Sequence, residues 1–532
     1  MIQERNINVD MFIEDVIENN SLATGRASQS IIDNISLNPS LCIPFFLRLI
    51  EGGLPDRKLE ALFLLIDESF SRISYGIDRG DSDAIDLQKS LQDEINNNLA
   101  KLPSEMVFQI NNILYDSNLS ININETSFQQ SFDKNIKGTG KHITPKLPEL
   151  IEKIRRETPF KTTFELFELI LKQIQMMPLS MQLGIVYEMA FTTKPLSHEM
   201  TVLMLLHPKE PVRITISNYI AELADEIPFT SVDLRRLILI RNWVANKEKS
   251  NIDYIINSIK KRLLTPAPSK PHRILKIMAS AIDGAGASSI MFEVKDSSCR
   301  KTAGLLTKIG LGIKDCWVQN KTPKNYLDNI IEENSDAMNV PFKEVSLAYL
   351  TKVIKHFISE NLKVNTVPPA LLIETAELLN TKEWNPEDLF LKEELSRLKP
   401  KYTNLLDNNK LDVHLQESEN WYYKYNFSSY WFECGDVAER SVRDGLAKLN
   451  KKDISLAGYS IAKELMKHFS EKWSITLLIT LLWMRSKKID KNNIIIFSIL
   501  YSINEGTPLE EIPLIQKIAM ETSKVVHHKI GI

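Results

Sequence analysis

Cysteines and long apolar runs are both scarce in this sequence, and each scarcity excludes a class of protein. The four cysteines lie far apart and form no Cys-x-x-Cys pair. Neither a disulfide framework nor a structural zinc site with closely spaced ligand pairs is therefore expected. The most apolar stretch, residues 475–484, has ten residues, about half of the roughly 20 that a membrane-spanning helix requires. With a second apolar run at 494–503, it predicts a buried helical hairpin and no membrane span.

The chain also lacks a net charge of one sign. Across 532 residues, 65 lysines and arginines stand against 68 aspartates and glutamates, a formal net charge of −3. This balance excludes a protein that is basic or acidic throughout, but it conceals a local asymmetry. Residues 1–100 hold eight basic and seventeen acidic side chains, a balance of −9. Residues 234–276 hold eleven basic and two acidic side chains, a balance of +9.

Glycine is scarce as well, with 18 in the whole chain, and the sequence is typical of helices joined by short polar turns. Apolar residues recur at helical spacing, as in Leu59, Leu62, Phe63 and Ile66. The N-terminus is acidic and has no apolar core, so it does not resemble a signal peptide. We therefore predict a mainly α protein in the cytoplasm, with helical N- and C-terminal blocks around a helical middle.

Composition divides this helical pattern into blocks. A stretch rich in Asn, Ser, Thr and Lys at 116–148 predicts a linker or long loop. Three prolines within 266–271 prevent a helix from continuing there. The predicted organisation is an acidic helical block at 1–115, the linker at 116–148, a helical region at 149–264, a small α+β module at 265–322, a helical region at 323–400, a polar and aromatic connection at 401–430 and a helical block at 431–532.

The connection at 401–430 ends in a dense group of aromatic residues, which continues to residue 432. Two interpretations fit such a group. It forms a recognition surface, or its rings anchor a long connection to a core, which is the commoner arrangement.

The small α+β module carries the β signal of the chain. Its turn-forming segment is Asp283-Gly284-Ala285-Gly286-Ala287, between two short β-compatible runs. A dinucleotide-binding loop would require a third Gly or Ala and then a helix, but Ser289 and a strand-like run stand there. A hairpin turn is therefore favoured, and an anion held at Asp283, Gly284 and Gly286 by backbone amides stays open. The expected runs are 273–280, 289–295, a strand or helix from 300, and 312–318.

One segment in the helical middle has a repeat-like pattern. Residues 205–213 read Leu-Leu-His-Pro-Lys-Glu-Pro-Val-Arg, and apolar positions continue through Ile216, Ile220 and Leu223. The apolar first helix, the proline-containing turn and Val-Arg at the start of the second helix resemble a HEAT repeat, with His207 where that family usually has aspartate. The resemblance covers one unit, residues 198–224, and implies α-solenoid packing in the middle of the chain. It implies binding only loosely, because a fold does not carry a function with it.

Motifs for catalysis or metal binding are missing from the sequence. The nine histidines are scattered without an HExxH pair, and no Gly-x-Ser-x-Gly elbow occurs. Cys316 follows Lys314, which would lower the pKa of a thiol, but an inert half-buried thiol is the simpler interpretation. We therefore predict no catalytic residue, metal ligand or cofactor.

The basic segment at 234–276 is the strongest candidate for a binding surface. Its side chains would meet the phosphates of a nucleic acid or another anionic ligand, with Trp243 able to stack on a base. In the interpretation that we favour, the acidic block docks on this segment or both are solvated. The candidate binding residues are Arg213, Arg235, Arg236, Arg241, Trp243, Lys260, Lys261 and Arg262.

Together these features favour a non-catalytic helical scaffold or adaptor that binds a protein partner. The first alternative is a nucleic-acid-associated protein that uses residues 234–276, which predicts salt-dependent binding to generic DNA or RNA. The second is an enzyme with a site at the insert, 272–320, around Asp283 and Asp315. That alternative predicts a pocket there with convergent polar groups.

Overall fold

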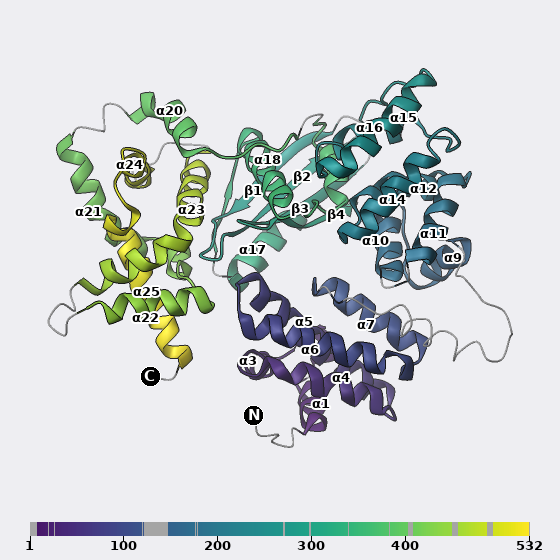
Figure 1. Cartoon of the computed structure of the whole chain (residues 1–532), viewed down its shortest axis with the longest axis horizontal. Coiled ribbons are helices and arrows are strands. Elements are labelled where there is room, and N and C mark those ends of the chain that lie inside the picture. Colours follow the sequence, from purple (N-terminus) through teal and green to yellow (C-terminus); the bar gives the residue numbers. More distant parts are fainter. Residues whose placement is uncertain are drawn as a thin grey trace. The chain divides into compact units, whose positions relative to one another are not determined.

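The computed structural model of the chain separates into two compact units, Met1–Met189 and Ala190–Ile532 (Figure 1). Most of the predicted linker at 116–148 lies outside the described residues. The structure describes residues 8–19, 21–25, 27–119, 121, 147–175, 177, 179–269, 272–296, 299–338, 340–381, 384–402, 408–449, 456–486 and 493–530.

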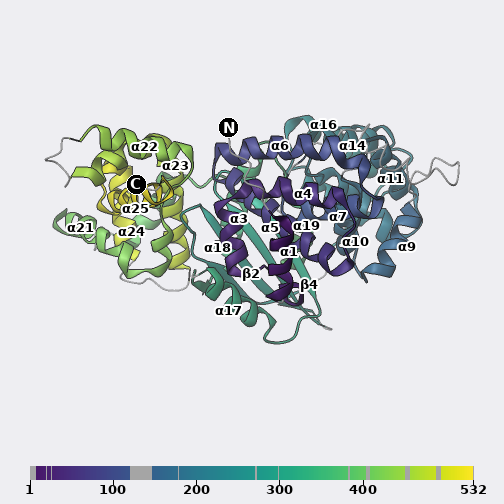
Figure 2. The same cartoon turned by 90° about the horizontal axis from the view of Figure 1, so that it is seen from below.

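In the described part of the first unit, α1 to α4, α6 and α7 pack against one long helix, α5 (Asp56–Asp78), and α10 contacts α7 and α9 (Figure 2). Leu62, Leu65, Ile66 and Phe70 recur on α5 at helical spacing and are fully buried. Of the four positions named from the sequence, Leu62 and Ile66 lie in this core, whereas Leu59 and Phe63 are only partly buried. The other helices are α1 (Val9–Glu18), α2 (Ser21–Thr24), α3 (Gln29–Leu37), α4 (Cys42–Glu51), α6 (Ser82–Asn98), α7 (Ser104–Asp116), α9 (Leu147–Glu157), α10 (Thr163–Ile174) and α11 (Leu179–Phe191).

The second unit begins with a group of helices in which α14 packs against α16 and α15 also contacts α16. The first helix expected in the HEAT-like segment is replaced by short pieces that end in a 3₁₀ turn, Met204–Leu206. The mainly α prediction is confirmed, whereas the helical repeat stays a prediction. These helices are α12 (Pro195–His198), α13 (Met200–Leu203), α14 (Glu210–Glu222), α15 (Ser231–Ile240) and α16 (Asn246–Lys261).

The α+β module is a single antiparallel sheet with the strand order β4-β3-β2-β1-β5. The segment from residue 300 is a strand, and the short β5 lies beyond the predicted limit of the module at 322. Helix α17 (Tyr326–Met338) is followed by β5, α18 (Leu347–Lys363) and α19 (Leu371–Leu378). The strands are β1 (Arg273–Ser280), β2 (Ala287–Lys295), β3 (Arg300–Lys308), β4 (Gly312–Asn320) and β5 (Phe342–Glu344).

Helices cover both faces of this sheet (Figure 1). On one face, Met278 and Met291 pack with Leu327 of α17. Helices α18 and α19 contact β4, where the Sγ of Cys316 lies 3.1 Å from the Oγ1 of Thr375. Cys316 is buried, and none of the four cysteines forms a disulfide. A buried thiol in a packed layer supports the interpretation of Cys316 as an inert residue.

The rest of the second unit is helical, and the expected hairpin of apolar helices is confirmed. Residues 475–484 belong to the long helix α23, which packs against α24. No helix in the described ranges is both long and apolar enough to cross a membrane. The segment 401–430, predicted as a connection, contains the 17-residue helix α21. These helices are α20 (Leu391–Tyr402), α21 (Asn408–Lys424), α22 (Asp436–Ala447), α23 (Ala457–Arg485), α24 (Asn493–Asn504) and α25 (Pro513–Ile530).

The aromatic group after α21 anchors the chain to the sheet. Trp431 is fully buried against Trp421 and Trp473, with ring centroids 5.3 and 5.6 Å away. The indole N–H of Trp431 donates to the carbonyl of Ile282, two residues after β1, over 3.0 Å. A buried Trp that both packs and pairs its N–H is a strong anchor. The anchoring interpretation of this group is therefore confirmed.

Candidate functional site

Three of the eight predicted binding residues lie inside the protein. Arg213 is 1% exposed, and its Nε lies 2.5 Å from a carboxylate oxygen of Glu248. Trp243 is buried, and its indole N–H donates to the carbonyl of Trp384 over 2.9 Å. Arg236 is buried as well. Side chains enclosed in this way cannot meet a ligand, so the prediction of Arg213, Arg236 and Trp243 as binding residues is corrected.

Arg236 and Arg235 share one acceptor, the carboxylate of Glu377. Their nitrogens lie 3.0 and 2.7 Å from its Oε1, and Arg236 also pairs with Glu199 at 2.8 Å. Burial works to lower the pKa of Arg236, but these carboxylates outweigh it and raise the pKa. The pKa of Glu377 is lowered, because the two arginines outweigh the opposing effect of its burial. This charge cluster joins α15 to α19 and is internally neutralised.

Two further arginines of the predicted set serve backbone or local contacts. Arg262 donates to the carbonyls of Ala224 and Ile227, just after α14, over 2.7 and 2.6 Å. Arg241 pairs with Asp253, with one N–O distance of 3.0 Å. Such contacts satisfy the backbone carbonyls that follow a helix and join neighbouring turns. The arginine-rich appearance of the segment therefore reflects mostly internal bonding.

Much of the positive charge of residues 234–276 that stays on the surface belongs to α16, and Arg262 and Arg273 beyond it are exposed as well. The buried side of α16 carries Ile252, Ile255 and Ile259, and its exposed side carries lysines. We define the lysine face as Lys247, Lys249, Tyr254, Lys260 and Lys261. Lys260 and Lys261 were predicted from sequence.

The lysine face has two edges. Lys247, Tyr254 and Lys261 recur every seven residues, which places them along one edge of the helix over about 21 Å. Tyr254 is 50% exposed at the middle of this edge. Lys249 and Lys260 lie along the other edge, beside Asp253. Tyr254 was not predicted from the sequence, although its seven-residue spacing from Lys247 and from Lys261 could have identified it as part of this edge.

Acidic groups on α16 do not cancel this charge. Glu248 is 1% exposed and bound to Arg213. The hydrogen bond from Arg241 is the main cause that lowers the pKa of Asp253; burial opposes it, and the charges of Arg241, Lys249 and Lys260 lower the pKa further. Asp253 therefore stays ionised but is matched by Arg241. The four lysines leave the exposed side of α16 positive.

The buried ion pair beneath this face adjoins a buried histidine. His207 lies in the turn before α14, its carbonyl accepts from Arg213 over 2.9 Å, and its Nδ1 accepts from the amide of Lys209 over 3.1 Å. Burial first, and then the charges of Lys209 and Arg213, lowers the pKa of His207 from 6.5 to about 3. His207 is therefore neutral in the folded protein throughout the mildly acidic range.

We predict that acid weakens the α14 region through His207. The unfolded chain takes up a proton below pH 6.5 whereas the folded protein does so only near 3, so stability is present above 6.5 and lost as the pH falls. At about 1.4 kcal/mol per pH unit, the change from pH 7 to pH 5 amounts to about 2 kcal/mol. Hydrogen exchange of α14 amides measures it, with His207→Asn as the comparison. An equal loss in wild type and variant would contradict a neutral buried His207.

The glycine-containing turn has a packing role. The amides of Asp283, Gly286 and Ala287 all donate within the turn, the last to the Asp283 carboxylate over 2.7 Å. A Cβ on Gly284 would lie 2.0 Å from the carbonyl oxygen of Tyr430. The hairpin is confirmed, but these contacts correct the prediction of an open anion-binding turn at Asp283, Gly284 and Gly286.

One group in the described chain brings metal-ligand types together. Atoms of His356, Glu360 and Asp388 lie within 4.8 Å of one another. Lys363 already occupies this position with its ammonium group, 2.8 Å from Glu360 and 2.9 Å from Asp388. The amide of Gly310 also donates to Glu360 over 2.7 Å. The group is therefore explained as a set of ion pairs and hydrogen bonds that joins the β3–β4 turn, α18 and the loop before α20.

Comparisons with known proteins follow the same segments of the chain. Family models described as "Y4lR second domain", "Domain of unknown function (DUF7401)" and "Y4lR C-terminal helical domain" match residues 178–262, 270–384 and 392–527. The chain is 22% identical over 293 residues to "Uncharacterized protein y4lR" of Sinorhizobium fredii (strain NBRC 101917 / NGR234). That alignment covers 54% of this chain and 54% of the relative, so the chain spans about half the length of the curated relative it matches. No solved structure matches.

The first of these models ends at residue 262, next to the last residue of α16, and the second contains the whole sheet with α17, α18 and α19. The lysine face thus lies within the segment similar to the second domain of Y4lR. None of these names states an activity.

Proposed function

We propose that the chain is a non-catalytic helical scaffold that binds an acidic segment of a partner protein along the lysine face of α16. The observation that carries this proposal is four lysines on the outer side of α16, where the acidic residues of the same helix are buried or paired. Lysine side chains at a rim give electrostatic complementarity and faster association with an acidic partner. In this proposal α14 and α16 stack as a helical repeat and turn the lysine face outward.

The charges around the lysine face favour a protein over a nucleic acid. Asp225 follows α14, and its carboxylate lies 2.6 Å from the hydroxyl of Ser258 on α16. Glu222 and Glu226 are exposed in the same segment. A phosphate backbone that ran on past the end of α16 would meet these carboxylates and be repelled. A protein segment of about 21 Å can match the lysines and leave the carboxylates uncovered.

A nucleic-acid-associated protein is the second candidate because of Tyr254. An exposed aromatic ring between lysines is the combination that binds single-stranded nucleic acid, with a base stacked on the ring. Tyr254 is flanked by Lys247 and Lys261, one on each side along the same edge. The two candidates therefore differ in whether the ring or the lysines alone carry the affinity.

The test uses the full-length protein and two labelled probes, a glutamate-rich helical peptide and a single-stranded RNA of equal charge. The variant changes all four lysines of the lysine face to Glu. We expect the peptide Kd to rise at least tenfold, and wild-type binding to weaken as salt is raised from low ionic strength, because exposed charges are screened. Fluorescence anisotropy measures both.

A matched control carries the same change in net charge at exposed lysines elsewhere in the second unit. Those lysines are Lys324, Lys392, Lys410 and Lys463. The control is expected to keep the peptide Kd within about twofold of wild type. Equal losses in both variants, or no peptide binding at all, would overturn the proposal. Tighter binding of RNA than of peptide, lost in Tyr254→Ala, would replace it with the second candidate.

A further inference from the structure

One end of the sheet in the second unit carries a row of basic side chains that is separate from the lysine face. Arg273 of β1 lies directly opposite Lys295 of β2, and Lys295 lies directly opposite Arg300 of β3. Lys321 follows the last residue of β4, where the amide of Thr322 donates to the carbonyl of Arg300 over 3.0 Å. Since neighbouring strands lie about 4.8 Å apart, the four cations span about 14 Å. We define the basic row as Arg273, Lys295, Arg300 and Lys321.

The sheet itself gains nothing from this arrangement. Directly opposite residues of an antiparallel pair lie on the same face, and like charges at such positions are destabilising. The basic row contains two of these pairs in succession, Arg273 with Lys295 and Lys295 with Arg300. A negatively charged ligand outside the sheet would turn this repulsion into attraction.

The carboxylates at this end of the sheet leave most of the basic row unmatched. Glu293 is 6% exposed and lies 2.7 Å from a guanidinium nitrogen of Arg300. Asp328 of α17 pairs with Lys276, further along β1, at 2.7 Å. Asp296 accepts from a backbone amide of its own turn over 2.8 Å. The other three members of the row are exposed, and none of them pairs with a carboxylate in the described ranges.

The surroundings of the basic row favour a phosphate backbone over a protein partner. Protein interfaces are centred on buried apolar and aromatic side chains. Among the described residues of 272–344, the exposed large apolar side chain is Leu306, which lies six positions along β3 from Arg300. The lysine face differs in this respect, because it contains the exposed ring of Tyr254. A ligand that is bound through its negative charges alone therefore suits the basic row.

The lack of exposed rings also separates a double strand from a single strand. Proteins that bind single strands stack the bases on exposed aromatic side chains. In the described part of 272–344 no aromatic side chain is exposed, and Trp317 packs against the apolar cluster beneath α17. A duplex keeps its bases inside and presents its phosphates, which lysine and arginine bind without contacting a base.

We propose that the basic row binds the phosphate backbone of a double-stranded nucleic acid without reading its sequence. Arg273, Lys295 and Lys321 each neutralise a phosphate, while Arg300 stays paired with Glu293. Three neutralised phosphates give a slope of about −2.7 for the logarithm of the association constant against the logarithm of the salt concentration. The row is a different surface from the lysine face, so each proposal can fail without the other.

The experiment measures the binding of a fluorescently labelled DNA duplex to the full chain by fluorescence anisotropy over a range of salt concentrations. Lys295→Gln is expected to reduce the salt slope by about one, because one phosphate contact is lost. Changing the three unpaired members of the row to Gln together is expected to raise the Kd at least tenfold at low salt. A duplex of scrambled sequence is expected to bind with the same Kd.

The matched control removes the same number of charges at exposed lysines elsewhere in the second unit. Those lysines, each changed to Gln, are Lys392, Lys410 and Lys463. The control is expected to keep the duplex Kd within about twofold of wild type. Hydrogen exchange of β2 amides checks the fold of Lys295→Gln, and it is expected to stay the same or become slower because a repulsion across the strands is removed.

Five results would contradict the proposal. They are no duplex binding, equal losses in the two triple variants, a preference for one duplex sequence, faster exchange of β2 in Lys295→Gln, and loss of duplex binding in Tyr254→Ala. The last result would assign the nucleic acid to the lysine face. If instead the row variant loses a glutamate-rich peptide that wild type binds more tightly than the duplex, the row is a protein-binding surface and the proposal is wrong.

Discussion

Replacing Arg213 with methionine is expected to destabilise the α14–α16 pair by about 3–5 kcal/mol, because a buried carboxylate is left without its partner. Arg213 and Glu248 are both 1% exposed. Arg213 also donates to the carbonyl of His207, which loses its partner in the same change. Methionine keeps the length and most of the volume of the arginine stem, so the loss reports on charge and hydrogen bonds.

The measurement is native-state hydrogen exchange of α14 and α16 amides in the full-length protein, since a chain of two units does not unfold in one step. Arg241→Met is the control, because the Arg241–Asp253 pair is 40% and 42% exposed and such pairs contribute about 0–1 kcal/mol. Arg213→Met combined with Glu248→Leu is expected to recover most of the loss. A single-variant effect no larger than that of Arg241→Met would contradict a buried pair that supports α14.

The Arg213–Glu248 pair is one of several buried contacts that could not be predicted from the sequence. The excess of basic residues at 234–276 was visible in the sequence, but the acceptors are remote. Glu377 lies 141 residues from Arg236, and Trp384 lies 141 residues from Trp243. No local pattern distinguishes an arginine that will meet a buried carboxylate from one that will face solvent. Of the residues selected for their charge, Lys260 and Lys261 are exposed, because no remote acceptor in the described chain draws them inward.

Those strands of the sheet that neighbouring residues in the sequence define could be predicted. The turn with Gly284 and Gly286 and the two runs that flank it identified β1 and β2 to within two residues. Strand β3 was ambiguous because Arg300–Lys308 reads RKTAGLLTK, which suits a helix or a strand. Strand β5 has three residues and is defined only by its pairing with β1. Pairing partners so far apart leave no mark in a single sequence.

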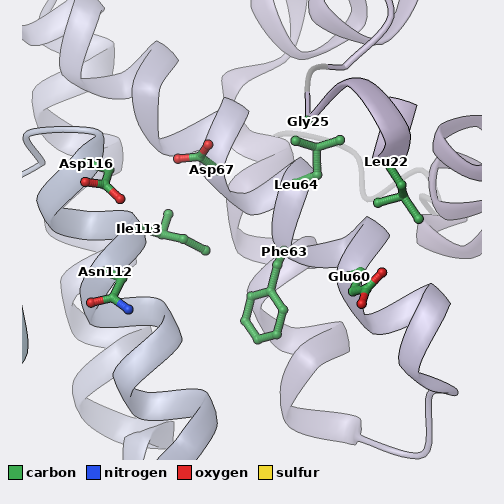
Figure 3. Close-up of a pocket in the computed structure, with 9 residues that line it drawn as sticks. All are labelled: Leu22, Gly25, Glu60, Phe63, Leu64, Asp67, Asn112, Ile113 and Asp116. Atoms are coloured by element: carbon green, nitrogen blue, oxygen red, sulfur yellow. The ribbon is translucent and has the colours of Figure 1, made fainter. Parts of the chain in front are cut away.

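The surroundings of Asp67 illustrate the same limit. Asp67 lines an open depression between α2, α5 and α7, which the chain visits between Leu22 and Asp116 (Figure 3). Composition showed that residues 1–100 are acidic but could not show which carboxylates lie close together. The raised pKa of Asp67 depends on burial and on Asp116, 49 positions away. Only the packing of α7 against α5 creates that environment.

Gly284→Ala is expected to cost about 3 kcal/mol, at the upper end of the usual range for overpacking. The added Cβ would lie 2.0 Å from the carbonyl oxygen of Tyr430 and 2.9 Å from the amide nitrogen of Phe432. Both are backbone atoms, so no side chain can rotate away to relieve the clash. Relief requires the hairpin and the segment 430–432 to move apart, which strains the 3.0 Å hydrogen bond from Trp431 to Ile282.

The fluorescence of the buried Trp431 and hydrogen exchange of β1 amides measure this effect. Gly184→Ala is the control, because Gly184 lies on an exposed side of α11 with no atom within 4 Å of a new Cβ. That change is expected to stabilise α11 by about 0.5–1 kcal/mol, since alanine is the better helix former. A Gly284→Ala protein as stable as wild type would mean that the hairpin does not hold the aromatic anchor. The expected loss instead identifies Gly284 as the position where the hairpin of the sheet meets the segment 430–432 backbone to backbone.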